Sequence, residues 1–356
     1  MRRGFRFGML ALLLAGTVSV GQLGTTAQDK PVVIGYSAPG LVGGQLVIQQ
    51  GLIDHAKAKG WEVQTTTSGG DPQKQIDDIN NYIAQGVSAI VAVPDDSAGI
   101  CTAVQAAKDA SIPFYTIDRS PQGCAINMTV LSDNYLAGKQ SAEGVVAFLK
   151  EKNGSEKGTV LEITGNLGQN VAQLRGSGFD DLIKQYPDIT LVTKTGDWDA
   201  AKGVDIVRDV VSTQDVDAIY MHSDSVYMPG TLQVLKELDK LTKAGEAGHI
   251  YLAGVDGSPA ALQAIRDGWA DQSSNQPIPD FGIIADYIDK ELKGEKIEPG
   301  DVVQEGALWS PARIEESDSG PQLFLATTSV TKENVDNPLL WANVSAGREA
   351  AATPTP

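Results

Sequence analysis

The sequence IPFYTIDRS, residues 112–120, runs through apolar residues to a carboxylate, Asp118, and then directly to a guanidinium, Arg119. An apolar run this short, interrupted by Pro113 and followed by Pro121, predicts a buried strand that ends by placing two charged groups at the edge of a sheet. In open α/β sheets, ligands bind at the carboxyl ends of strands. A carboxylate acceptor beside a five-donor guanidinium can bind a neutral molecule rich in hydroxyls. An ion pair that only closes the strand end is an equally simple interpretation.

A second copy of this pattern occurs later in the chain. Residues 250–259, IYLAGVDGSP, again form an apolar run that ends at an aspartate, Asp256. The similarity extends upstream, because AIVAVPDDS at 89–97 has a counterpart in AIYMHSDS at 218–225. A repeat of this length predicts two similar α/β lobes, each a doubly wound parallel sheet whose strands end at a common cleft.

Length and charge limit the range of functions. A chain of 356 residues predicts two domains or one large domain, and its 42% hydrophobic content is sufficient for an extensive core. The formal net charge is −17, which argues against nucleic acid and anionic membrane surfaces as partners. It also makes an anionic ligand less favourable than a neutral one.

The first 27 residues have the pattern of a secretory signal peptide. Arg2, Arg3 and Arg6 precede an apolar stretch at 8–20. This stretch is too short to span a membrane. We therefore expect residues 1–27 to be removed and the mature protein to be periplasmic or extracellular.

The chain contains two cysteines, Cys101 and Cys124. In an oxidising compartment they are expected to form one disulfide, although two free buried thiols are the alternative. The three histidines are scattered, and we expect His55 and His249 to lie at the surface. Neither residue type has the spacing of a metal site, so no metal or cofactor is expected.

Taken together, these patterns resemble a known family. The chain resembles the periplasmic sugar-binding proteins of ABC importers, the ribose-binding-like or type I group, from Val32 to about Asn337. The likeness rests on IPFYTIDR at 112–119, LSDNYLAGK at 131–139, RGSGF at 175–179, GDWDAAKG at 196–203 and AGVDGSP at 253–259. Related repressors carry a DNA-binding helix pair where this chain has a signal peptide, which argues against a repressor.

The resemblance implies a type I periplasmic binding protein fold, in which two lobes joined by a multi-strand hinge close on a ligand. The expected division of the chain is a signal peptide at 1–27, lobe one at 28–132 plus 277–308, lobe two at 133–276 plus 309–337, and a disordered tail at 338–356.

The resemblance also implies which residues bind the ligand. The expected contacts are Gln45, Asp118, Arg119, Arg175, Trp198, Ser223, Asp256 and Gln276. The charged members would bind sugar hydroxyls, and Trp198 would pack on the sugar ring. The loop at 39–45 departs from relatives, which have an Asn and two Phe there, and leaves Gln45 as its polar candidate. Ser223 stands where an Asn is expected, and we expect Asp224 to cap the following helix.

The expected function is capture of a small neutral sugar or polyol by a monomeric protein and delivery to an ABC transporter permease, with no catalytic residue and no cofactor. One alternative is a sensor that presents its ligand to a membrane kinase or chemoreceptor. A remoter alternative is a secreted carbohydrate-active enzyme with Asp118 and Asp256 as a carboxylate pair. Arg119, next to Asp118, argues against the enzyme because it favours a permanently ionised carboxylate.

Overall fold

Two parallel sheets dominate the structure, a computed structural model that describes residues 1, 4, 31–41 and 43–344. Apart from Met1 and Gly4, the expected signal peptide lies outside the described residues. From Val32 onward the chain folds as one unit. Among the described helices, none combines the length and apolar character that a bilayer crossing requires.

Lobe one is built on an eight-stranded sheet of order β11-β12-β13-β5-β4-β3-β1-β2. Its strands are β1 (Val33–Ala38), β2 (Glu62–Thr67), β3 (Ala89–Ala92), β4 (Phe114–Ile117), β5 (Met128–Ser132), β11 (Gly300–Val302), β12 (Ala312–Glu315) and β13 (Gln322–Leu325). Its helices are α1 (Gly44–Ala58), α2 (Pro72–Gln85), α3 (Cys101–Asp109), the 3₁₀ segment η1 (Ile278–Ile283) and α9 (Ile284–Leu292). The pairing is parallel except at β11–β12 and β12–β13.

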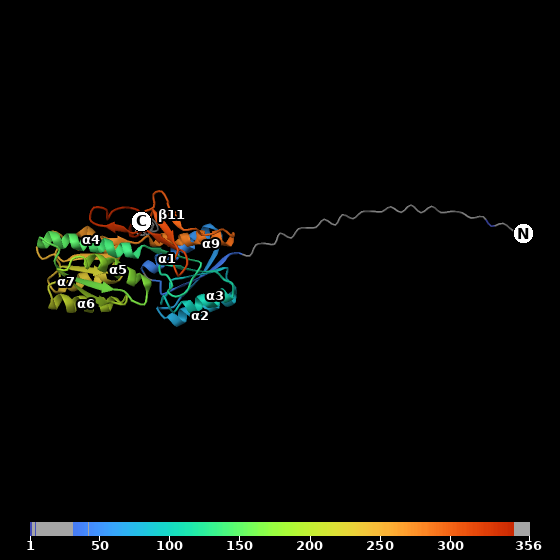
Figure 1. Cartoon of the computed structure of the whole chain (residues 1–356), viewed down its shortest axis with the longest axis horizontal. Coiled ribbons are helices and arrows are strands. Elements are labelled where there is room, and N and C mark those ends of the chain that lie inside the picture. The colour runs from blue at the N-terminus through green and yellow to red at the C-terminus, as the bar shows by residue number, and fades with distance from the viewer. Residues whose placement is uncertain (2–3, 5–30, 42, 345–356) are drawn as a thin grey trace, which may run out of the picture. The chain divides into compact units, whose positions relative to one another are not determined.

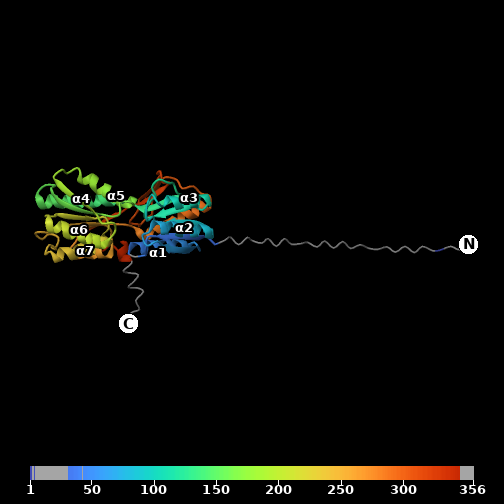
Figure 2. The ribbon, with the colours of Figure 1, turned by 90° about the horizontal axis from the view of Figure 1, so that it is seen from below.

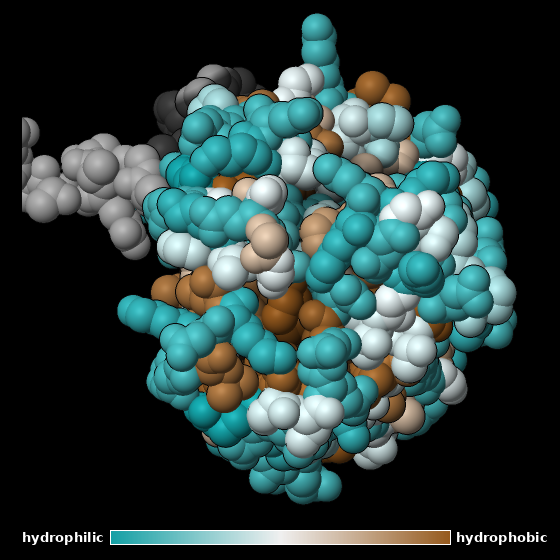
Figure 3. All heavy atoms as spheres, turned by 90° about the vertical axis from the view of Figure 1, so that its left-hand side faces the viewer, coloured by the Kyte–Doolittle hydropathy of each residue, from teal (hydrophilic) through white to brown (hydrophobic). Residues whose placement is uncertain are grey.

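Lobe two is built on a six-stranded sheet of order β14-β10-β9-β8-β6-β7, in which only β14 is antiparallel. Its strands are β6 (Gly158–Thr164), β7 (Ile189–Thr195), β8 (Ala218–Met221), β9 (Tyr251–Asp256), β10 (Gln272–Asn275) and β14 (Thr328–Val330). Its helices are α4 (Asn134–Asn153), α5 (Asn170–Ile183), α6 (Ala200–Thr213), α7 (Asp224–Glu237) and α8 (Pro259–Asp267). Figures 1 and 2 show α4 and α5 on one face of this sheet and α6 and α7 on the other. The outer end of this lobe is largely hydrophilic in Figure 3.

The local sequence explains these elements. The central strands β3 (AIVA) and β4 (FYTI) are buried along their whole length, as expected for parallel strands covered by helices on both faces. Helix α2 shows how helix ends are set: the Asp71 side chain accepts hydrogen bonds from two N–H groups of the first turn, and Gly86 ends the helix with φ 67°. Both sheets therefore present the carboxyl ends of their parallel strands at defined positions.

Three segments connect the lobes: the links from β5 to α4, from β10 to η1 and from β13 to β14. The expected lobe boundaries were wrong near the C-terminus. We expected residues 309–337 in lobe two, but β12 and β13 belong to the sheet of lobe one. The reason is that Leu323 and Leu325 of β13 are buried and β13 pairs in parallel with β5. The chain returns to lobe two only at β14.

The expected disorder from residue 338 onward was also wrong for the part of the tail that the structure describes. Leu340, Trp341 and Ala342 are buried, and residues 341–344 are helical. The apolar sequence LLWA at 339–342 explains this order, because it gives the segment a hydrophobic face to pack. Residues 345–356 lie outside the described part of the chain.

His249 is buried, whereas we expected it at the surface. Its Nε2 lies 3.0 Å from both carboxylate oxygens of Asp271, and its Nδ1 lies 2.9 Å from the carbonyl oxygen of Thr242. Burial lowers the pKa of His249, but the hydrogen bond and the charge of Asp271, together with the hydrogen bond to the Thr242 carbonyl, outweigh burial, and the net pKa is raised. The charged form of this histidine therefore stabilises the fold.

A pH-dependent loss of stability is expected when His249 is replaced by Gln. A histidine whose pKa is raised in the folded state contributes stability that is fully present below its unfolded pKa of roughly 6.5 and is lost as the pH rises through the folded pKa. His249→Gln should therefore destabilise the protein more at pH 6 than at pH 9, measured by urea unfolding of variant and wild type at each pH. An equal loss at both pH values would show that the His249–Asp271 pair is not charged.

Candidate functional site

A cleft of about 800 Å³ lies between the two lobes, at the carboxyl ends of strands from both sheets. All eight residues that the sequence assigned to ligand binding line this cleft. They come from segments as far apart as the start of α1, which carries Gln45, and the crossing after β10, which carries Gln276. The fold thus brings the predicted residues together at one place.

The lobe-one wall of the cleft is centred on Asp118 and Arg119, which directly follow β4. Both are buried, and Asp118 has a positive φ of 66°. Oδ2 of Asp118 accepts a hydrogen bond of 2.9 Å from Gln45 Nε2 and lies 3.7 Å from Arg119 Nε. Arg119 also donates from Nη1 to the carbonyl oxygen of Pro94 over 3.0 Å. Burial lowers the pKa of Arg119, while the nearby carboxylates of Asp118 and Asp95 act in the opposite direction.

The lobe-two wall is centred on the buried guanidinium of Arg175 on α5. Its Nε donates to Asn134 Oδ1 over 2.8 Å, and its Nη1 donates to the carbonyl oxygen of His222. The same Nη1 lies 3.4 Å from Asp256 Oδ1. This one side chain therefore joins the start of α4, the end of β8 and the end of β9.

Asp256 ends β9 with a φ of 128° and accepts hydrogen bonds at both carboxylate oxygens. Gln276 Nε2 donates to Oδ1 over 2.7 Å. The hydroxyls of Ser223 and Ser225 donate to Oδ2 over 2.6 Å and 2.5 Å. Ser223 and Gln276, both predicted ligand contacts, thus also hold Asp256 in position.

Asp224 does not cap the helix that follows it, contrary to expectation. Ser223 is the N-cap of α7, and the Asp224 carboxylate instead accepts from the backbone N–H groups of Gly257 and Ser258. Burial, with the nearby charge of Asp256, raises the pKa of Asp224 to about 7. Asp224 therefore holds the turn after β9 in place but does not line the cleft.

Trp198 lies on the lobe-two side with a positive φ of 59°. Its indole Nε1 donates to Gln169 Oε1 over 2.5 Å, and the Arg175 guanidinium lies 5.6 Å from the ring centroid. Gly165 is required here, because a Cβ at that position would overlap the Trp198 ring. The indole is therefore fixed in orientation at the wall of the cleft.

Beside the cleft, hydrogen bonds join the two lobes directly, and we call this group the latch. Lobe two contributes the segment around the start of α5, and lobe one contributes the loops after β3 and β4. The contacts are Gln169 Nε2 to Asp95 O (2.8 Å), Ser97 N to Gly168 O (3.3 Å), Asn170 N to Ser97 Oγ (3.2 Å), Ser120 N to Asn170 Oδ1 (3.0 Å) and Gln122 Nε2 to Gln173 Oε1 (2.8 Å). The lobes are therefore in a closed arrangement.

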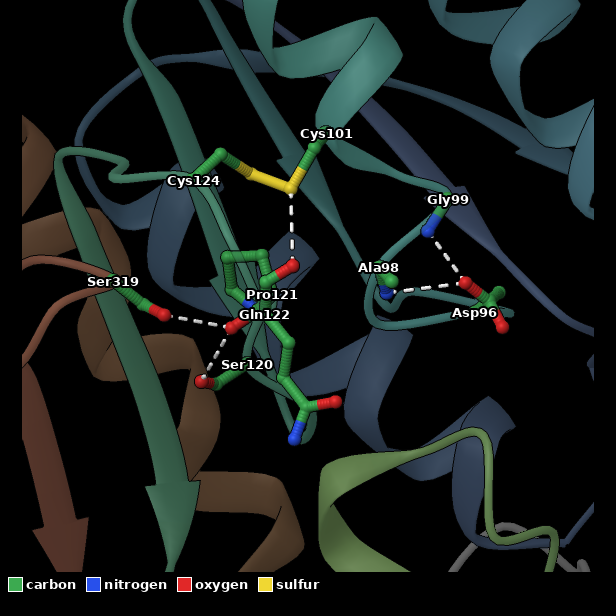
Figure 4. The surroundings of a disulfide bond; sticks show 9 residues. All are labelled: Asp96, Ala98, Gly99, Cys101, Ser120, Pro121, Gln122, Cys124 and Ser319. Atoms are coloured by element: carbon green, nitrogen blue, oxygen red, sulfur yellow. Dashed lines mark hydrogen bonds between the residues drawn. A yellow bond between two sulfur atoms is a disulfide. The ribbon is translucent and has the colours of Figure 1, made fainter.

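A disulfide connects the two lobe-one loops of the latch. Cys101 at the start of α3 is joined to Cys124 in the loop after β4, with an S–S distance of 2.02 Å. Figure 4 shows the bridge next to Ser120 and Gln122, with Cys101 Sγ directed at the carbonyl oxygen of Gln122. The disulfide thus ties the loop that carries Ser97 to the loop that carries Ser120 and Gln122.

Among the residues of the cleft wall that sequence reasoning missed are Asp95, Gln169 and Trp341. Asp95 follows β3, so the strand-end rule that singled out Asp118 could also have selected it. Gln169 precedes α5 without a distinctive motif. Trp341 belongs to the segment that we expected to be disordered, and nothing in its local sequence indicates the cleft.

The cleft has an acidic but mixed polar character. Its lining includes five aspartates and two arginines, which disfavours an anionic ligand. Within the described part of the chain, three buried polar atoms of lining residues have no hydrogen-bond partner: Gln45 Oε1, Arg119 Nε and Gln276 Oε1. Both lobes of the site therefore have unused hydrogen-bonding capacity. The described residues contain no group of side chains suited to a metal ion.

Comparison with known proteins gives consistent matches. The family model described as periplasmic binding protein domain matches residues 34–296. A ribose import binding protein of Bacillus subtilis is 31% identical over 70% of this chain and 78% of its own length. A galactofuranose-binding protein of Escherichia coli is 28% identical over 80% of this chain and 91% of its own length. A solved structure of a galactofuranose binding protein superposes with a TM-score of 0.73, at 25% identity, over 87% of this chain and 97% of that one.

Replacement of Arg175 by Met is expected to lower the free energy of unfolding by about 3 kcal/mol, because Met leaves buried acceptors and the Asp256 carboxylate without their cation. The control is Arg208→Met, which removes an exposed pair with Glu237 (side chains 44% and 43% exposed) and should cost less than about 1 kcal/mol. Urea unfolding measures both. Equal losses in the two variants would contradict a central structural role for Arg175.

Proposed function

The chain belongs to the periplasmic binding protein family, and from this premise we propose that it captures a neutral sugar or polyol between its lobes and delivers it to the permease of an ABC importer. The observation that carries the proposal is the cleft, which is lined by Asp and Arg side chains from both lobes and by the indole of Trp198. Two relatives are named for binding ribose and galactofuranose, and these names support a sugar as the ligand.

The chemistry of the cleft suits a carbohydrate. A sugar has a rim of hydroxyls that both donate and accept hydrogen bonds, and its ring faces are apolar. Carboxylates and guanidinium groups bind hydroxyls through charge-assisted hydrogen bonds. Asp118 Oδ1 makes no hydrogen bond within the described residues, so it can accept from a hydroxyl. Arg119 Nε and the amide oxygens of Gln45 and Gln276 add a donor and two acceptors.

Reversible closure is the proposed mechanism. The open protein admits the sugar, both lobes bind its hydroxyls, and hinge rotation brings the latch together. The permease then recognises the surface of the closed protein. The relatives named as import proteins favour transport over sensing.

A binding role suits the cleft better than catalysis. Both oxygens of Asp256 accept hydrogen bonds within the protein, which leaves this carboxylate poorly placed to act as a nucleophile or proton donor. We extend the proposal to a monomer that is exported by the sequence at 1–27 and functions in the periplasm or outside the cell without a cofactor.

Ligand binding should appear as a thermal shift. Mature protein, residues 28–356, is heated with pentoses, hexoses, polyols and inositols, with amino acids as controls. A ligand at about 100 times its dissociation constant stabilises the native state by about 2.7 kcal/mol, so one or a few sugars should raise the Tm clearly. Shifts with amino acids alone would contradict the sugar assignment.

Asp118→Ala should abolish this shift, because the variant removes a buried carboxylate of the lobe-one wall. The control is Asp301→Ala on the edge strand β11, where the residue is exposed and is not part of the cleft lining. Circular dichroism verifies that both variants are folded. An unchanged shift in Asp118→Ala would remove this residue from the site.

Closure makes a separate prediction. Asn170 does not line the cleft, but its Oδ1 accepts from Ser120 N of the other lobe. Loss of one such hydrogen bond costs about 1 kcal/mol, so Asn170→Ala should weaken sugar binding by about fivefold. Asn153→Ala, which removes a bond to the Lys157 carbonyl within lobe two, should leave the affinity unchanged. Calorimetric titration of both variants decides whether the latch contributes to affinity.

A further inference from the structure

The C-terminal segment 331–344 is held firmly against lobe two, and we call it the C-terminal strap. Arg266 of α8 anchors it: Nε donates to Asp336 Oδ1 over 2.7 Å, and Nη2 donates to Asn343 Oδ1 over 2.6 Å and to the carbonyl oxygen of Val335 over 3.1 Å. Asn343 in turn donates to the carbonyl oxygens of Val335 and Asn337. The same arginine therefore fixes the strap near its middle and near its C-terminal end.

This anchoring places Trp341 at the cleft. The indole Nε1 donates over 2.7 Å to the backbone carbonyl of Asp256, the residue whose carboxylate faces Arg175 and Gln276. Trp341 is 5% exposed and lines the cleft together with Gln276 and Ile278 at the crossing between the lobes. The hydrogen bond fixes the plane of the ring at this position.

Trp341 matters because the lining of the cleft contains few aromatic residues. Apart from Trp341, Trp198 is the only aromatic side chain among the lining residues that the structure describes. The loop 39–45 of lobe one contributes none. The Arg175 guanidinium is already packed near the Trp198 ring. A sugar ring bound beside Asp256 thus has one other aromatic surface available to it, and that surface is the Trp341 indole.

We propose that Trp341, delivered by the C-terminal strap, is a ligand-contacting residue that packs on the apolar face of a cyclic sugar and so selects cyclic sugars over acyclic polyols. The inference rests on the proposed function of the cleft. Stacking on an indole contributes both buried apolar area and a geometric preference for a flat ring face. An acyclic polyol has no such face, so it gains less from the same contact.

The test compares Trp341 variants in full mature protein. Calorimetric titration measures the affinity of wild type, Trp341→Phe, Trp341→Leu and Trp341→Ala for ribose, galactose, myo-inositol and xylitol. For the cyclic ligands that wild type binds, Trp341→Ala should lose about tenfold or more in affinity, Trp341→Leu nearly as much, and Trp341→Phe less than about threefold. The loss for xylitol should be smaller than for the cyclic ligands.

Two truncations provide a matched pair. Removal of 338–356 should reproduce the effect of Trp341→Ala, whereas removal of 345–356 keeps the strap and should leave every affinity unchanged. Thermal unfolding without ligand verifies that the variants fold, and Trp341→Phe serves if the smaller side chains prevent folding, since a large loss with Phe at an unchanged Tm would also overturn the proposed ring contact.

The outcomes separate this inference from the function on which it rests. Wild-type affinity for a sugar with no loss in Trp341→Ala would overturn the role of Trp341 alone. An equal loss for cyclic sugars and xylitol would assign Trp341 a wall-forming role and overturn its selectivity. Failure of wild type to bind any of the four compounds, together with no shift in the wider sugar panel, would overturn the proposed function and this inference with it.

Discussion

A buried guanidinium cannot remain without partners, and this requirement on Arg175 organises the lobe-two half of the site. Burial of a charge is costly unless the charge is paired and its hydrogen-bond donors are satisfied. Arg175 meets the requirement with Asn134, the carbonyl oxygen of His222 and the carboxylate of Asp256. These partners stand at the ends of different elements, so satisfying one side chain fixes the relative positions of α4, β8 and β9. Asp256, held further by two serines, is then presented to the cleft in a defined orientation.

The two lobes position a carboxylate at the cleft by related means. In each, an apolar parallel strand ends at an aspartate, Asp118 after β4 and Asp256 at the end of β9, and both residues have positive φ. A side-chain amide from a separate segment holds each carboxylate, Gln45 for the first and Gln276 for the second. Each amide retains a buried oxygen with no partner in the described part of the chain. The halves of the cleft thus combine a fixed carboxylate with a free acceptor.

Much of this site followed from the sequence, and the reasons for the misses are physical. Asp118 and Asp256 could be predicted because the carboxyl ends of parallel strands converge at one sheet edge. Arg175 and Trp198 depended on the resemblance, because neither a buried arginine nor a ring at a strand end has a local signature. Trp341 could not be predicted, since it meets Asp256 across 85 residues of sequence. The assignment of β12 and β13 failed for the same reason: strands so short do not reveal which sheet they join.

The latch determines which substitutions such a protein can accept while it keeps the ability to close. Four of its five lobe-to-lobe hydrogen bonds use at least one main-chain N–H or C=O group. Three of these four also need a side chain, that of Gln169, Ser97 or Asn170, so closure depends on these residues as well as on the backbone. The disulfide between Cys101 and Cys124 ties the course of the lobe-one loops down. Of the latch residues, only Asp95 and Gln169 line the cleft. Ligand binding in the cleft and the closing movement therefore depend on largely separate sets of residues. Substitutions in the cleft, whether natural or designed for a biosensor, can change the bound ligand while the closing step is retained.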